Sequence, residues 1–164
     1  YATLCRKLGL PVGFRGPEAA FRAVHCASDV ELLNKGMLWA ATTPACANEA
    51  FNMVNGDHFR WQHLWPRIAD YFGLKDGGVQ QIDLELMMAD KAPLWDEIVR
   101  EHGLVPTPFE EAANWSFANY AFAPTWDIML DNTKARKFGF QEFVDSEEMF
   151  FRIFDSFREQ RFIP

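Results

Sequence analysis

The stretch EAFNMVNGDHFRWQHLWPRIADYFGL, residues 49–74, has the order of a strand, a tight Asn-Gly turn and an amphipathic helix. Phe51 and Met53 alternate with Asn52 and Val54, and this short alternation predicts a strand that pairs with a sheet. We expect Asp57 to cap the following helix. Pro66 lacks an amide, which predicts a kink or a late helix start. The side chains expected to pack this helix are Trp61, Leu64, Trp65, Ile68 and Phe72, with Gly73 closing it.

The turn in this stretch lacks what phosphate binding requires. A dinucleotide fold places G-x-G-x-x-G after its first strand, so that the backbone and the helix amino terminus can hold the pyrophosphate. The segment VNGDHF, residues 54–59, has a single glycine, and Asp57 brings a negative charge to the position of the phosphate. We therefore expect a βα unit without a nucleotide and assign no cofactor-binding residue to the chain.

Length, charge and cysteine content narrow the class of protein. With 164 residues, 49% of them hydrophobic, the chain can form one domain with a sizeable core. Its net charge of -7, from 23 acidic and 16 basic residues, argues against nucleic acid as a partner. No apolar run approaches the roughly 18 residues that span a bilayer, so we expect no membrane partner. Three widely spaced cysteines without a CxxC pair suit a reducing, cytoplasmic location.

Capping signals predict several further helices. Ser28 and Glu31 form a capping box ahead of a packing helix that ends at Pro44. Asp90 precedes an amphipathic helix that Gly103 stops. Other helix starts are expected at Thr107 with Pro108 and Glu110, within TKARKFGF (residues 133–140), and at Asp145 or Ser146.

Strand signals are fewer. TWDIMLD, residues 125–131, alternates Ile128 and Leu130 with Asp127 and Met129 and is a second strand candidate. Residues 13–27 and 75–93 are irregular, and the second of these segments is expected to be a crossover. The pattern predicts a helix-rich α/β chain with too few strands for a complete sheet of its own.

No catalytic or metal-binding constellation stands out. The four histidines show neither HExxH spacing nor pairing with the cysteines, and no serine lies in a GxSxG elbow. Tyr71 and Lys75 have the i, i+4 spacing of the tyrosine and lysine in short-chain dehydrogenases, but Gly73 interrupts the helix between them. We therefore assign no catalytic and no metal-binding residue.

The first residues, YATLCRKLGLP, carry an apolar pattern at Leu4, Cys5 and Leu8 that Gly9 and Pro11 terminate. No capping residue and no initiator Met precede this pattern. We expect the last turns of a longer helix, and hence a fragment of a longer protein. A short helix docked on the core is the alternative.

YATLCRKLGLP, SDVELLNKGMLWAA, LMMADKAPLWDEIVREHGLVPTP, NTKARKFGF and the closing FIP, taken with residues 49–74, resemble one family in this order. It is the progesterone 5β-reductase and iridoid synthase-like group of extended short-chain dehydrogenases/reductases, which includes bacterial proteins labelled NAD-dependent epimerases. The resemblance is to the carboxy-terminal part. It implies that residues 1–164 form a single substrate-binding domain or fragment of an extended Rossmann-type reductase.

The same resemblance places the family's glycine-rich loop and its catalytic tyrosine and lysine upstream of Tyr1. An amino-terminal Rossmann domain, absent from this chain, would then be its partner and would bind NADP or NAD. In the family, the helix that matches NWSFANYAF, residues 114–122, lines the substrate pocket. The implied substrate-binding residues are Trp115, Ser116, Phe117 and Tyr120. Ordinary core packing is the alternative for this stripe, and the spacing leaves both open.

Two functions follow from these observations. In the first, the chain is the substrate-binding part of an NAD(P)H-dependent reductase that acts on the activated C=C or C=O of a small apolar substrate, and is inactive alone. In the second, it is a self-contained helical binding or interaction module without catalysis. A separated reductase part should expose apolar surface and could form a homodimer, whereas a self-contained module should be a monomer with a closed core.

Overall fold

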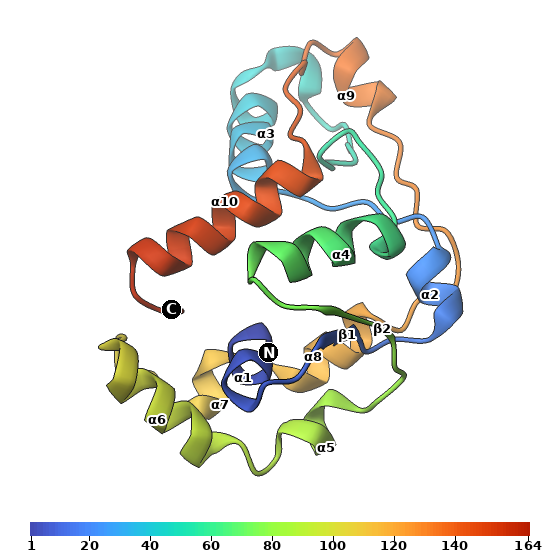
Figure 1. The fold of residues 1–164 in the computed structure, drawn as a ribbon. Coiled ribbons are helices and arrows are strands. Elements are labelled where there is room, and N and C mark those ends of the chain that lie inside the picture. Colours follow the sequence, from blue (N-terminus) through green and yellow to red (C-terminus); the bar gives the residue numbers. More distant parts are fainter. The chain divides into compact units, whose positions relative to one another are not determined.

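The computed structural model describes residues 1–164, the whole chain, as two compact units. The first unit comprises Tyr1–Ala23, Arg60–Trp126 and Phe151–Pro164, and the second comprises Val24–Phe59 and Asp127–Phe150. Each unit is described by itself. Figure 1 shows that helices dominate the chain and that strands are few, which confirms the helix-rich α/β prediction.

Short helices and two strands make up the first unit, together with α10 from Phe151 onward. These elements are α1 (Ala2–Leu8), β1 (Val12–Phe14), α2 (Glu18–Arg22), α4 (Trp61–Tyr71), β2 (Asp76–Val79), α5 (Leu84–Met88), α6 (Ala92–His102), α7 (Phe109–Ala112), α8 (Trp115–Ala121) and α10 (Ser146–Glu159).

The sheet of the first unit consists of β1 and β2, which pair in parallel with an irregularity between their two registered residue pairs. Val12 lies opposite Asp76, and Phe14 lies opposite Val79. The sequence predicted neither strand, because β1 is only three residues long and buried at every position, so it shows no alternation. The strand β2 contains a Gly-Gly pair, which is typical of a turn.

Helix α4 packs against β1 through the stripe predicted from the sequence, and the side chains of its predicted residues are buried. Trp65 also donates a hydrogen bond from Nε1 to the Val12 carbonyl at 3.1 Å. Gly73, with φ of 63°, adopts the left-handed conformation just after the helix. The helix begins at Trp61 rather than at Asp57, and Pro66 lies inside it rather than in its first turn.

Phe14 lies in an aromatic cluster in the core of the first unit. Its ring centroid is 5.3 Å from that of Trp65 and 5.1 Å from that of Phe122, both in edge-to-face geometry. Edge-to-face aromatic pairs are favourable because the positive edge of one ring meets the negative face of the other. This cluster joins the sheet, α4 and the residue that follows α8.

The second unit contains α3 (Val30–Thr42), the 3₁₀ turn η1 (Pro44–Cys46), α9 (Thr133–Lys137) and the first turn of α10. Its core is formed by Leu32, Ala135 and Phe140, against which Phe51 and Met53 pack. The predicted strand at these two residues is therefore wrong, because their side chains fill a helical core and their backbone forms no ladder. The α9 helix predicted within TKARKFGF is confirmed.

The predicted strand within TWDIMLD is also wrong. Residues 125–131 are irregular, and the Ile128 amide donates a single hydrogen bond to the Val24 carbonyl at 2.8 Å. The Asp127 carboxylate accepts from the Val24 amide at 2.8 Å. One side-chain contact therefore replaces the second backbone contact that a ladder would need.

The Asn-Gly turn of the opening stretch holds the second unit together instead of starting α4. Asp57 accepts hydrogen bonds from the Ser146 amide at 2.8 Å and from the Ser146 hydroxyl at 2.6 Å, and so ties the start of α10. The Asn55 side chain is fully buried. It accepts a hydrogen bond from the Asp29 amide at 2.6 Å and donates one to the Ser146 hydroxyl at 3.0 Å. The prediction that Asp57 caps the helix that follows it is thus wrong, because Asp57 instead accepts hydrogen bonds from the distant Ser146.

Three other predicted caps are shifted. Asp29, rather than Ser28, caps α3 by accepting from the Glu31 and Leu32 amides, and the Ser28 hydroxyl donates to the Met53 carbonyl at 2.9 Å. The helix expected from Asp90 begins at Ala92, without a side-chain cap, and ends as predicted before Gly103. The helix expected from Thr107 is α7, whose cap position is Pro108, and it ends before α8. The α10 start at Ser146 is confirmed.

No helix combines the length and the apolar character needed to span a membrane.

Candidate functional site on α8

The site begins with the cap that starts α8. Asn114 accepts a hydrogen bond from the Phe117 amide at 2.9 Å, which satisfies one of the free donors of the first turn. The Ser116 hydroxyl donates to the same Asn114 oxygen at 3.0 Å. Asn114 therefore separates α7 from α8 and sets where the predicted pocket helix starts.

Helices α5 and α8 pack against each other, and Asn119 fastens one to the other. Its side-chain amide donates to Asp83 at 2.8 Å, and its carbonyl accepts from the Leu84 amide at 2.8 Å. Asp83 in turn caps α5 by accepting from two backbone amides. The Asn119 amide and these backbone donors stabilise the carboxylate and lower the pKa of Asp83.

Three of the four predicted site residues face solvent from α8. Phe117 is 62% exposed and Tyr120 is 73% exposed, and their ring centroids lie 6.1 Å apart. Ser116, the residue before Phe117, is also exposed. The structure therefore brings Phe117 and Tyr120 together as an aromatic pair with one free side, which we call the outer face of α8. Exposed apolar side chains that lie side by side can serve as a contact surface for a ligand or another domain.

The fourth predicted residue points into the protein. Trp115 lines a pocket of about 310 Å³ and packs against the core cluster that includes Trp95 and Ile98. Its ring centroid lies 5.7 Å from that of Phe109. Successive helix residues are separated by about 100°, so Trp115 and Phe117 lie on nearly opposite sides of α8. The four residues thus form two surfaces and not one pocket wall.

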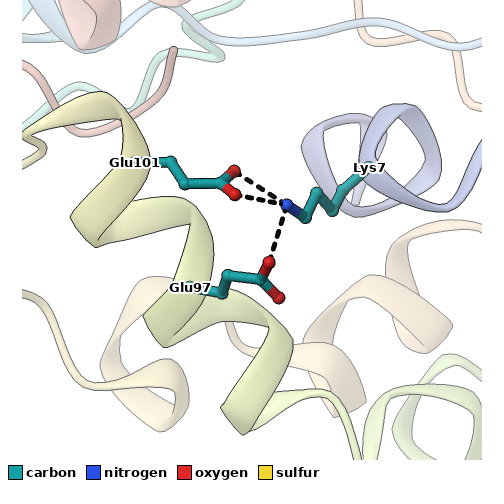
Figure 2. Close-up of polar contacts among 3 residues, drawn as sticks. All are labelled: Lys7, Glu97 and Glu101. Carbon is teal, nitrogen blue, oxygen red and sulfur yellow. Dashed lines mark hydrogen bonds and ion pairs between the residues drawn. The ribbon is translucent and has the colours of Figure 1, made fainter.

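A charged cluster holds α1, which also borders this pocket, to α6 (Figure 2). The Lys7 ammonium lies 2.9 Å from a Glu97 oxygen and 2.7 Å from a Glu101 oxygen. Glu97 and Glu101 are one helical turn apart, so both carboxylates reach the same cation. The hydrogen bonds that Lys7 donates to Glu101 and Glu97 raise the pKa of Lys7, and the one to Glu101 lowers the pKa of Glu101.

Sequence reasoning missed Asn119 and the contribution of the chain end to the pocket, where Phe157 and Phe162 lie. A signal for Asn119 was present, because an asparagine inside a helix often serves a side-chain contact with the backbone. Phe162 reaches the pocket because the neighbouring residue 161 is hydrogen-bonded to residue 105. No local sequence pattern predicts a contact between residues so far apart. Their backbones are joined by a 2.9 Å hydrogen bond from the Val105 amide.

The Tyr71 and Lys75 pair does not have the geometry of a catalytic pair. Gly73 ends α4 between them, and the Tyr71 hydroxyl donates to Asp155. Burial and the Asp155 hydrogen bond raise the pKa of Tyr71, whereas proton donation by a tyrosine at neutral pH requires a lowered pKa. Tyr71 instead anchors α10, with the Arg158 guanidinium 4.3 Å from its ring centroid.

No group of three or more His, Cys, Asp or Glu side chains converges to hold a metal ion. The sequence likewise contains no G-x-G-x-x-G segment for a dinucleotide.

Known proteins resemble the chain over its whole length. An (S)-8-oxocitronellyl enol synthase of Nepeta cataria is 36% identical over 168 residues, and one of Camptotheca acuminata is 35% identical over 169 residues. A 3-oxo-Delta(4,5)-steroid 5-beta-reductase of Arabidopsis thaliana is 33% identical over 168 residues. Each match covers 100% of this chain but only 43% of the relative.

The family comparison agrees with these relatives and confirms the resemblance noted in the sequence. The model of the PRISE-like Rossmann-fold domain matches residues 4–164. The relatives are matched in their carboxy-terminal part. Because the match extends over all but the first three residues, the chain belongs to the family of PRISE-like Rossmann-fold domains.

Proposed function

We propose that this chain is the substrate-binding part of an NAD(P)H-dependent reductase that acts on the activated C=C or C=O of a small apolar substrate. The observation that carries the proposal is the outer face of α8, where Phe117 and Tyr120 present an exposed aromatic surface. Its position is fixed by Asn119 and by the Asn114 cap. The family membership and a relative that is a steroid reductase support the same class of reaction.

In this proposal the outer face forms one wall of the substrate site. The other wall, the nicotinamide of NADP or NAD, and the tyrosine and lysine that polarise the substrate oxygen belong to a Rossmann domain outside these 164 residues. The relatives leave room for such a domain, because this chain spans only 43% of their length. Two adjacent exposed aromatic rings favour an apolar substrate, since its burial removes apolar surface from water.

The exposure of the outer face also distinguishes this proposal from a self-contained helical module. A closed module should bury its large apolar side chains, but Phe117, Tyr120 and Leu86 of α5 are between 62% and 76% exposed. Such surface is unfavourable in water unless a substrate or another domain covers it. Association of two chains through this face is a further expected consequence, and sedimentation velocity would detect a homodimer.

Calorimetric titration tests the proposal on the chain itself. NADPH should produce no binding heat, because the chain has no glycine-rich loop and its Asn-Gly turn is occupied by Asp57 and Ser146. Sedimentation of the chain in the presence of a hydrophobic dye should report accessible apolar surface. Micromolar NADPH binding would contradict the proposal that the cofactor binds to another domain. A strictly monomeric chain that binds no dye would favour the self-contained module.

A further inference from the structure

Helix α3 of the second unit is apolar on two sides. Its inner side holds Leu32, Gly36 and Trp39, of which Leu32 and Trp39 pack in the core of that unit. Its other side carries an exposed stripe without a charged residue, which we call the α3 stripe: Val30, Leu33, Met37, Leu38 and Ala41. Val30 and Leu38 are 68% and 66% exposed. A helix that is apolar on both sides is normally covered on both, so the α3 stripe has the character of a contact surface.

Residues 51–54, which lie beside α3, have a free backbone edge. The amides of these four residues donate no hydrogen bond within the protein. The Met53 carbonyl accepts from the Ser28 hydroxyl at 2.9 Å, and the Met53 side chain lies over Gly36 of α3. Four consecutive amides are therefore available to a neighbouring strand, at the place where the sequence pattern predicted one.

A parallel sheet fits both features at once. In α/β folds, a helix and the strand that follows it form one unit, in which the strand joins the sheet and the apolar stripe of the helix covers a face of the sheet. Helix α3 and residues 51–54 follow in that order, but the second unit contains no β-strand. The family is one of Rossmann-fold domains, and this chain spans only 43% of the length of its relatives.

From these observations we infer that the α3 stripe and residues 51–54 are the docking surface for the parallel sheet of an amino-terminal Rossmann domain. Residues 51–54 add to the edge of that sheet as a strand, and the α3 stripe covers the adjoining face. Main-chain hydrogen bonds align the added strand, and burial of the stripe stabilises the contact. The inference rests on the proposed function for the existence of that domain, but it concerns the second unit and not the outer face of α8.

Hydrogen exchange, read by mass spectrometry with residue-level fragmentation, tests the inference. It compares the 164-residue chain with a chimera that joins the amino-terminal part of the Arabidopsis thaliana steroid reductase to it. In the chimera, alternate amides of residues 51–54 should exchange at least about 100-fold more slowly than in the chain, because a strand bonds every second amide to one neighbour. The Asn55 amide, already bonded to the Ala27 carbonyl at 2.9 Å, is the internal control and should change much less.

Substitutions then test the α3 stripe. Met37→Asp should leave the urea midpoint of the chain nearly unchanged, because Met37 is exposed there. In the chimera it should reverse the slowing at residues 51–54 at least about tenfold, because docking would bury the carboxylate. Phe143→Asp, at an exposed residue of the second unit outside α3, should change neither. If the Met37→Asp chimera does not fold, Val30→Asp replaces it, since a carboxylate is favourable in the first turn of a helix.

The outcomes separate this inference from the reductase proposal. A chimera that oxidises NADPH while residues 51–54 exchange as fast as in the chain would overturn the inference and leave the reductase proposal standing. Slow exchange at these residues in a chimera without activity would do the reverse. Equal slowing at Asn55 would indicate general stabilisation and would also overturn the inference. So would slow exchange in the chain alone that increases with its concentration and is lost in Met37→Asp, because the surface would then bind a second copy.

Discussion

Asp57 and Ser146 are 89 positions apart in the chain, yet the Asp57 carboxylate accepts both the amide and the hydroxyl of Ser146, at 2.8 and 2.6 Å. The Asn-Gly-Asp turn that looked like the phosphate loop of a βα unit is thus the cap of a remote helix. Asn55 extends the link to Asp29, the cap of α3. The turn therefore holds the starts of α3 and α10 in the second unit. Asn55 of the turn and Ser146 of α10 are both fully buried.

Asp57→Ala should destabilise the second unit. The substitution leaves the Ser146 amide and hydroxyl without acceptors, so the free energy of unfolding should fall by about 1–3 kcal/mol. Asp70→Ala is the matched control, because Asp70 is exposed near the end of α4. Urea denaturation followed by circular dichroism measures both variants. Equal effects would show that Asp57 carries no special role.

Gly56→Ala should be destabilising for a backbone reason. Gly56 has φ of 101°, and an added Cβ would lie 2.9 Å from Arg136 Nη2. The strain should cost about 1–3 kcal/mol. Gly9→Ala is the comparison, because Gly9 has φ of 65° and no atom within 4 Å of its Cβ position. A thermal melt should show a smaller loss for Gly9→Ala, and the reverse order would contradict this account of the turn.

Removal of the Lys7 charge should make stability less dependent on pH. The pKa of Glu101 is lowered in the folded protein, so its contribution exists above the ordinary pKa of a glutamate and is lost as pH falls through the lowered value. The pKa of Lys7 is raised, so its contribution is present at neutral pH and is lost only in strong alkali. Lys7→Met should therefore reduce the melting temperature at pH 7 but not at pH 2.

The cluster of Lys7, Glu97 and Glu101 is partly open to solvent, so the effect at pH 7 should be small and should shrink in 1 M NaCl. Lys35→Met is the matched control, because Lys35 pairs with the single carboxylate Glu142. A Lys7→Met deficit that persists at pH 2 would mean that packing, and not charge, holds α1 to α6.

Asn119→Ala should loosen α8. The Leu84 amide and the Asp83 carboxylate both lose a partner, and the free energy of unfolding should fall by about 1–2 kcal/mol. The pKa of Asp83 should also rise toward its ordinary value, because the Asn119 amide is the largest cause of its depression. Carboxyl-carbon NMR titration measures this shift. An unchanged Asp83 pKa would show that α5 and α8 are not coupled through Asn119.

The sequence predicted elements whose signals are local. The stripe of α4, the glycine end of α6 and the start of α10 follow from spacing within a few residues, and the structure has all three. The strands β1 and β2 escaped prediction because each is short and gains its stability from the other, across more than 60 residues. Asp57 was assigned to the wrong helix for the same reason, since its partner Ser146 is remote.

The candidate site was predictable to a similar extent. The resemblance indicated α8, and all four residues lie on it. The separation of Trp115 from Phe117 follows from the helical repeat and could have been predicted. The contribution of Phe157 and Phe162 to the pocket beside Trp115 could not be predicted, because it depends on long-range packing.

Steady-state kinetics of a chimera test the central claim most directly. The amino-terminal part of the Arabidopsis thaliana steroid reductase, joined to this chain, should oxidise NADPH when a 3-oxo-Delta(4,5)-steroid is added. Removing one contacting ring should cost about 1–2 kcal/mol, so Phe117→Ala and Tyr120→Ala should each raise KM about 5–30-fold. Phe143→Ala, at a phenylalanine that is 74% exposed in the second unit, should leave KM within about twofold. An active chimera in which Phe117→Ala and Tyr120→Ala behave like Phe143→Ala would contradict the claim that the outer face of α8 contacts the substrate.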